Sequence, residues 1–354
     1  MYVKRTSGAT MTPTVARFSL LSVVLLTALR AGLPTNVRRA VAAGQVTFTE
    51  YMSYTEVVAY LRALKERYPK LVTVGSVGRS VEGREIYYAR VSSGGANNPI
   101  MLVDALMHAR EWITLPPVLY FLETLVQDAT LRAGLDVVVV PILNPDGYEY
   151  SRTKDRLWRK NRGATSNKTC VGVDLNRNFD YHWADFRSNN GASSDPCELT
   201  YAGPKAASEP ETISYQNFVR NLNAGKRVKM YVNLHNPEQS IYIPWGYSST
   251  APKVPDTAQL TTIAKEANSA LVAAGARAFT VETMAADYPA TGTVSDWVRG
   301  VAGVAQSFCM ELPAGGPDKQ QGFAVPPSSI LPISKEVLGA MKVFVKYTTK
   351  PLSQ

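Results

Sequence analysis

Residues 99–129 read PIMLVDALMHAREWITLPPVLYFLETLVQDA, and this stretch decides the fold. Two apolar runs, PIMLVDAL and WITLPPVLYFL, favour a buried strand followed by a helix. Between them stand three polar side chains, His108, Arg110 and Glu111, within four residues. Burying such groups is costly unless each finds a partner, and a metal ion is one candidate partner.

On both sides of this stretch, apolar strands alternate with helical patterns. Ser53 and Glu56 form a capping box that predicts a helix start. The region 145–225 is polar, aromatic and rich in glycine, and it shows no clear period. We expect helices at 53–69, 114–129, 256–275 and 334–347, and strands at 71–78, 84–92, 99–106, 135–143, 228–235 and 303–312. This alternation predicts an α/β fold, a mixed, largely parallel twisted sheet with helices on both faces.

Three polar stretches follow buried strands of this predicted sheet. His108 and Glu111 follow residues 99–106, NPDGY follows residues 135–143, and His235 ends the strand at 228–235. Ligands collect at the carboxyl ends of parallel strands, so these groups are expected to meet at one edge. His108, Glu111 and His235 would form a His₂Glu set for one Zn²⁺ with a position left open for water. The chain has three histidines, and the third, His182, is interpreted as a surface residue.

The N-terminal segment explains most of the positive charge. The chain has 354 residues and a formal charge of +9, and residues 1–46 hold six basic and no acidic residues, which leaves +3 for the rest. A basic leader followed by the short apolar run 18–29 is typical of a secretory signal, although a buried helix or a signal anchor would also fit. We expect residues 1–47 to be a signal and short linker without a folded prodomain, and residues 48–354 to be one domain. No nucleic-acid partner and no stable membrane span are expected.

The three cysteines fit an exported protein. Cys170 and Cys197 could close a disulfide loop outside the cell. Cys309 lies in the apolar run AQSFCMEL and is interpreted as a small buried residue of the core.

The neighbourhood of these residues strongly resembles the zinc metallocarboxypeptidases of the carboxypeptidase A/B type. The resemblance runs in order from about residue 48 to residue 348. It rests on nine stretches: HAREWIT, NPDGY, RLWRKNR, CVGVDLNRNFD, YAGPKAASEPET, IPWGY, YPATGTVSDW, FCMEL and GFAVPPSSILP. It implies the carboxypeptidase-like fold, and zinc binding by His108, Glu111 and His235.

The resemblance also implies roles for the residues around the metal. Asp174 would accept the second ring proton of a ligand histidine. Glu311 would be the general base, and Arg159 would face the scissile carbonyl.

A second group of residues would bind the substrate. Asn176 and Arg177 would hold its terminal carboxylate, Tyr288 would close over it, and Arg110 would touch the substrate further from the cut.

The sequence departs from the family pattern at three places. Residues 104–107 read DALM where glycines are usual, so Ala105 and Leu106 add side chains that we expect to be accommodated by repacking. Pro237 replaces an aromatic residue of the substrate groove. Ser295, at the base of the side-chain pocket, is neither apolar nor acidic. Asp287 is a possible source of negative charge near this pocket.

These residues predict a secreted, extracellular, monomeric, zinc-dependent exopeptidase that acts on the C-termini of peptides and proteins. We expect it to release neutral aliphatic or aromatic residues, with release of Lys or Arg as the alternative. A catalytically silent protein that binds peptide C-termini is a further alternative, which the retention of Glu311, Arg159 and all three ligands disfavours. A digestive and a processing role are equally compatible with the sequence.

Overall fold

The computed structural model describes residues 44–184, 191–318 and 321–350. Most of the expected signal and linker, at 1–47, therefore lies outside the described residues. The chain forms one eight-stranded sheet in the order β1-β2-β4-β3-β5-β8-β6-β7. Its strands are β1 (Val72–Arg79), β2 (Glu85–Ser92), β3 (Ile100–Asp104), β4 (Asp136–Val140), β5 (Val228–His235), β6 (Glu238–Ile243), β7 (Thr280–Thr283) and β8 (Gln306–Pro313).

The centre of this sheet is parallel. β4, β3, β5 and β8 pair in parallel, whereas β1, β2 and β6 join through antiparallel pairs and β7 pairs with β6 in parallel. Both faces of the central strands are buried, as the continuous apolar runs predict. The mixed, largely parallel sheet is thus confirmed.

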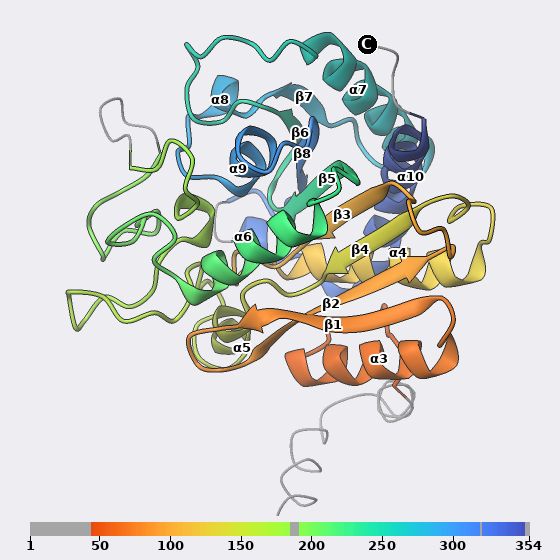
Figure 1. Ribbon diagram of the computed structural model, residues 1–354. Helices are drawn as coiled ribbons and strands as arrows, with labels where there is room; N and C mark the ends of the chain where they lie inside the picture. The colour runs from red at the N-terminus through yellow and green to blue at the C-terminus, as the bar shows by residue number, and fades with distance from the viewer. Residues whose placement is uncertain (1–43, 185–190, 319–320, 351–354) are drawn as a thin grey trace, which may run out of the picture.

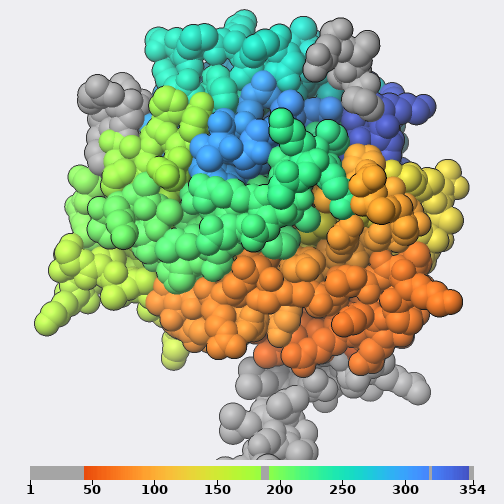
Figure 2. Space-filling view, in the orientation of Figure 1, coloured from red at the N-terminus to blue at the C-terminus, as the bar shows by residue number. Residues whose placement is uncertain are grey.

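Helices cover both faces of the sheet (Figure 1). One face packs against α3 (Tyr54–Arg67), α4 (Leu115–Gln127), α7 (Thr257–Ala273) and α10 (Ile330–Thr349), and the other against α6 (Pro210–Leu222) and α9 (Val294–Gly300). Within the described residues, the remaining α-helices are α5 (Pro145–Thr153) and α8 (Met284–Asp287). Short 3₁₀ turns are η1 (Trp112–Thr114), η2 (Leu175–Arg177), η4 (Gln321–Phe323) and η5 (Pro327–Ser329). Figure 2 shows the molecule in the same orientation, and the green side chains of the α6 region cover the middle of this face.

Local sequence signals explain how several elements begin. Ser53 caps α3 with the expected capping box, because its side chain accepts from the backbone N–H of Glu56 while the Glu56 carboxylate accepts from that of Ser53. Asn144 caps α5 by accepting from the Gly147 N–H. Each cap provides partners for N–H groups that a helix start leaves unpaired.

The residues that stand in place of the usual glycines before the first ligand are apolar, and one of them has an unusual backbone conformation. Ala105 and Leu106 are fully buried in the core. Leu106 adopts a left-handed conformation with φ of 50°, which costs a side-chain-bearing residue about 1–2 kcal/mol. Hydrogen bonds on both sides hold this residue, since its N–H donates to Thr114 Oγ1 and its carbonyl accepts from the Asn144 N–H.

The start of α6 buries two carboxylates beside one amide. Asn161 Nδ2 donates to Glu209 Oε2 at 2.7 Å and to Glu211 Oε2 at 3.1 Å. Glu211 is fully buried, and desolvation raises its pKa to about 7 despite the hydrogen bonds that it accepts. Because the pKa is raised, at a pH between the two values the folded protein holds a proton that the unfolded chain has released.

Stability is therefore expected to fall as pH rises from about 4.5, the ordinary pKa of Glu211, through about 7. Each pH unit in this window is worth about 1.4 kcal/mol, so the loss from this group reaches at most about 3 kcal/mol. Glu211→Gln should remove this pH-dependent loss. The free energy of unfolding in urea should therefore rise for Glu211→Gln relative to wild type as the pH increases from 5 to 8. Glu66→Gln, on the exposed face of α3, is the control that should track wild type. A parallel pH profile for Glu211→Gln and wild type would contradict the assignment.

Candidate metal centre

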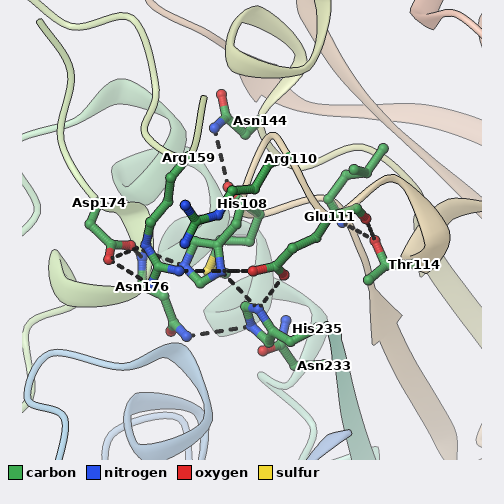
Figure 3. A network of polar contacts seen from close by, with 12 residues as sticks. His108, Arg110, Glu111, Thr114, Asn144, Arg159, Asp174, Asn176, Asn233 and His235 are labelled. Atoms are coloured by element: carbon green, nitrogen blue, oxygen red, sulfur yellow. Dashed lines mark hydrogen bonds and ion pairs between the residues drawn. The ribbon is translucent and has the colours of Figure 1, made fainter. Parts of the chain in front are cut away.

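Two neighbouring strands bring the three predicted ligands together. His108 and Glu111 lie in the loop after β3, and His235 is the last residue of β5, the parallel neighbour of β3. The Nδ1 atoms of the two histidines lie 3.0 Å apart. Glu111 spans them, with Oε1 at 2.8 Å from His108 Nδ1 and Oε2 at 2.9 Å from His235 Nδ1 (Figure 3). The predicted juxtaposition is confirmed.

The geometry of these atoms fits a metal ion. All three side chains are buried, and one ligand atom from each lies within 4.8 Å of the others. Ligands at about 2.0–2.1 Å from a tetrahedral zinc lie about 3.3 Å apart, close to the separations seen here. Nitrogen and carboxylate ligands also match the chemistry of zinc. His182 takes no part in this group, and its exposed ring stacks on Tyr247 at 3.6 Å.

Asp174 fixes the orientation of the first histidine. Its Oδ1 lies 3.1 Å from His108 Nε2, which therefore carries the ring proton and leaves Nδ1 as the lone pair facing the metal group. Its Oδ2 accepts from Arg159 Nε at 3.0 Å and Nη2 at 2.8 Å. Burial would raise the pKa of Asp174, but the charges of Arg159 and His108 outweigh it and hold the pKa well below its ordinary value. The carboxylate therefore stays ionised.

Arg159 faces the metal group from the loop after α5. Its Nη1 lies 3.8 Å from Glu111 Oε1, and its backbone carbonyl accepts from the Ala109 N–H at 3.0 Å. The two hydrogen bonds from Nε and Nη2 to the same oxygen of Asp174 hold the guanidinium in place. A cation is thereby held beside the group that would bind the metal.

Glu311 lies on β8, the parallel neighbour of β5. β8 pairs with β5 so that Glu311 stands opposite His235. The side chain is buried, and its Oε2 has no hydrogen-bond partner among the described residues. Desolvation raises the pKa of Glu311, an effect that Glu111 strengthens and His235 opposes. A buried carboxylate with an uncommitted oxygen is suited to taking up a proton.

Three of the predicted substrate-binding residues lie around this centre. Arg177 is buried in η2, where Nε donates to the Gly191 carbonyl and Nη1 to the Asn176 carbonyl. Asn176 is engaged within the protein, since Oδ1 accepts from the Val294 N–H and Nδ2 lies 3.4 Å from His235 Nε2. The Tyr288 side chain is exposed at 37%, but its hydroxyl is buried. This burial and the charge of Glu311 raise the pKa of the hydroxyl, and Arg177 opposes this shift.

Arg110 directly precedes the ligand Glu111 and packs against η4. Its guanidinium stacks over the Phe323 ring at 3.9 Å, and its buried Nε has no partner among the described residues. Desolvation and the nearby Arg159 lower its pKa to about 10, so the side chain stays charged at neutral pH.

Ser295 lies in α9 near a small apolar cluster. This cluster consists of Tyr242, Met284, Ala290 and Cys309. It borders Gly246, where an added Cβ would meet Met284 Sδ at 2.7 Å and Asp296 Oδ2 at 3.4 Å. Asp296 follows Ser295 and accepts from the N–H groups of Gly246 and Tyr247. At the edge of the cluster the Tyr242 hydroxyl donates to Asp287 Oδ2 at 2.6 Å.

Asn144 belongs to this network, although the sequence alone predicted no role for it. Asn144 follows β4 within the NPDGY stretch, and its side chain lies beside the loop that carries His108 (Figure 3). An asparagine directly after a buried strand is the signal that could have marked it.

Two further predictions concern the periphery. Cys170 and Cys197 form a disulfide, as expected for this pair, and Cys309 is a buried free cysteine. None of the helices in the described ranges has the length and apolar character needed to cross a bilayer.

Comparisons with known proteins agree with this geometry. The family model described as zinc carboxypeptidase matches residues 57–340. Carboxypeptidase B of Astacus astacus is 36% identical over 310 residues, which cover 85% of this chain and 99% of that protein. Carboxypeptidase A1 of Bos taurus is 33% identical over 322 residues, which cover 89% of this chain and 74% of that protein.

A solved structure shows the same fold. The crystal structure of carboxypeptidase A from Helicoverpa armigera superposes with a TM-score of 0.81 at 30% identity, over 94% of this chain and 80% of that one. Sequence, fold and the His-Glu-His group thus agree, and the chain belongs to the zinc carboxypeptidase family as a metallocarboxypeptidase of the A/B type.

Proposed function

We propose that this protein is a secreted, monomeric exopeptidase that binds one zinc ion per chain at His108, Glu111 and His235. It hydrolyses the last peptide bond of peptides and proteins. The observation that carries this proposal is the convergence of two Nδ1 atoms, 3.0 Å apart, on both oxygens of one carboxylate. The Cys170–Cys197 disulfide supports secretion, because disulfides persist mainly in oxidising compartments.

The residues around the metal group would divide the chemistry among them. Zinc, when bound, polarises a carbonyl and lowers the pKa of water toward ~7. Glu311, with its unpartnered oxygen, accepts the proton of the attacking water and passes it to the leaving amine. Arg159 stabilises the negative charge that develops on the carbonyl oxygen, and losing one such donor costs about 3–4 kcal/mol in the barrier.

Recognition of the chain end would fall to a second group. An exopeptidase must bind a free carboxylate, and the planar guanidinium of Arg177 suits this task. Asn176 adjoins it in η2, and Tyr288 lies near both Glu311 and Arg177. Arg110 would touch the substrate further from the cut.

The side-chain pocket favours neutral residues in this proposal. The apolar cluster of Tyr242, Met284, Ala290 and Cys309 borders the end of α9 that carries Ser295. Burying a Phe or Leu side chain against such a surface is worth about 1.5–3 kcal/mol, which is roughly ten- to a hundredfold in rate. The alternative, release of Lys or Arg, is favoured by the Asp287 carboxylate at the edge of this cluster.

A panel of peptides that differ only in a C-terminal Phe, Leu, Lys or Arg tests this preference. We expect kcat/KM for Phe and Leu to exceed that for Lys and Arg by at least about tenfold. Asp287→Asn, assayed beside wild type, separates the two assignments. A wild-type preference for Lys or Arg that disappears in Asp287→Asn would overturn the neutral assignment.

A further inference from the structure

The side chain of Asn144 joins two loops of the metal centre. Its Nδ2 donates to the Met107 carbonyl at 3.1 Å and to the Lys160 carbonyl, also at 3.1 Å. Met107 directly precedes the ligand His108, and Lys160 directly follows Arg159. Asn144 itself is fully buried.

This bridge requires a group that donates twice. Both partners are carbonyl oxygens, so only a side chain with two N–H bonds on one atom satisfies both. The Asn144 Oδ1 is used separately, since it accepts from the Gly147 N–H as the cap of α5. A shorter or acidic side chain would keep the cap but leave the two buried carbonyls unpaired or facing a negative oxygen.

Gly147 leaves room for the bridge. A Cβ added at this position would lie 2.5 Å from the Lys160 carbonyl oxygen and 2.6 Å from Asn144 Nδ2. Such distances force atoms to shift, and the nearest atom belongs to the backbone of the Arg159 loop. Two residues of the NPDGY stretch, Asn144 and Gly147, thus serve the same contact.

The two loops that the bridge joins carry opposite parts of the centre. One bears His108 and Glu111, and the other bears Arg159, whose Nη1 lies 3.8 Å from Glu111 Oε1. The Ala109 N–H donates to the Arg159 carbonyl, so the bridge and this bond join the two loops at residues 107 and 109, on either side of His108. A displacement of about 1 Å between reacting groups can cost about a hundredfold in rate.

We propose that Asn144 is a positioning residue for peptide hydrolysis: its amide holds the Arg159 loop at a fixed distance from the His108 loop, and Gly147 provides the space. This proposal rests on the role proposed above for Arg159. Asn144→Ser retains a capping oxygen and removes the bridge, while Asn144→Asp retains both the cap and the shape. Gly147→Ala keeps the amide and displaces the bridge.

All three variants are expected to lower kcat by about ten- to a hundredfold with KM within about threefold. Zinc should still bind, with an affinity loss of about tenfold or less in competition with a chelator, because the ligands themselves remain. Asn223 provides the matched control, because it lies beside the first residue of β5, at the opposite end of this strand from His235. Its Nδ2 donates to the Ala302 carbonyl and its Oδ1 accepts from the Val228 N–H, so Asn223→Ser removes a similar pair of contacts. It should lower the melting temperature and leave kcat unchanged.

A double-mutant cycle decides whether Asn144 acts through Arg159. In an Arg159→Ala background, Asn144→Ser should lower kcat by less than about threefold further, because the group that it positions is gone. An undiminished loss in that background would overturn the proposal. So would a variant that resembles Asn223→Ser, with lower stability and unchanged kcat, or failure of all three variants to fold, since the role would then be purely structural. If Arg159→Ala alone leaves kcat unchanged, the proposed role of Arg159 fails instead.

Discussion

Replacing Glu311 with glutamine is expected to lower kcat by about 10²–10⁴-fold while zinc and peptide affinity stay within a few-fold of wild type. Glutamine has the same shape but cannot accept a proton from water and pass it on. Glu311 is placed for this task because it stands opposite His235 in the sheet with one buried oxygen that has no partner among the described residues. Zinc content, peptide binding by calorimetry and steady-state kinetics together measure the separation.

A neighbouring carboxylate supplies the control for this experiment. Glu238 lies on β6, and its charge contributes to raising the pKa of Glu311. Glu238→Gln removes this nearby charge without removing the base, so its kcat should stay close to wild type. Equal turnover by Glu311→Gln and wild type would refute the role of Glu311. A wild-type protein that binds peptides without releasing residues would favour the silent binder.

Replacing His235 with alanine is expected to lower zinc affinity by more than the ~10–100-fold that loss of an outer partner costs. Hydrolysis should disappear at zinc concentrations that saturate wild type. The reason is geometric, since His235 Nδ1 lies 3.0 Å from His108 Nδ1 and 2.9 Å from Glu111 Oε2, and no second nitrogen in the described site could replace it. Competition with a fluorescent chelator measures the affinity.

The third histidine of the chain provides a matched control. His182 is exposed and stacks on Tyr247 outside the metal group. His182→Ala should bind zinc and hydrolyse peptides as wild type does. If His182→Ala lost zinc and His235→Ala retained it, the assignment of the third ligand would be wrong.

The sequence predicted the part of the centre that depends on strand ends. Continuous apolar runs indicated β3, β5 and β8, and parallel pairing then places the residues at their carboxyl ends side by side. The capping box at Ser53 likewise predicted the start of α3, because its two hydrogen bonds are local. Such features need only the short-range pattern of the chain.

Other elements escaped prediction for physical reasons. α6 buries Glu211, Thr212 and Gln216 along with Tyr215 and Val219, so its inward face lacks a hydrophobic period. β7 has four residues, none of them fully buried, and therefore carries no strand signal. The bridge made by Asn144 joins residues 107 and 160, and only the folded chain brings these carbonyls to one amide.

The central claim is that two imidazoles and one carboxylate hold a zinc ion on which hydrolysis depends. Release of the C-terminal residue from a peptide, followed before and after chelation and again after zinc is restored, tests it most directly. We predict one zinc per chain, loss of release on chelation and recovery with about one equivalent of zinc. Undiminished release by protein shown to be free of metal would contradict the account.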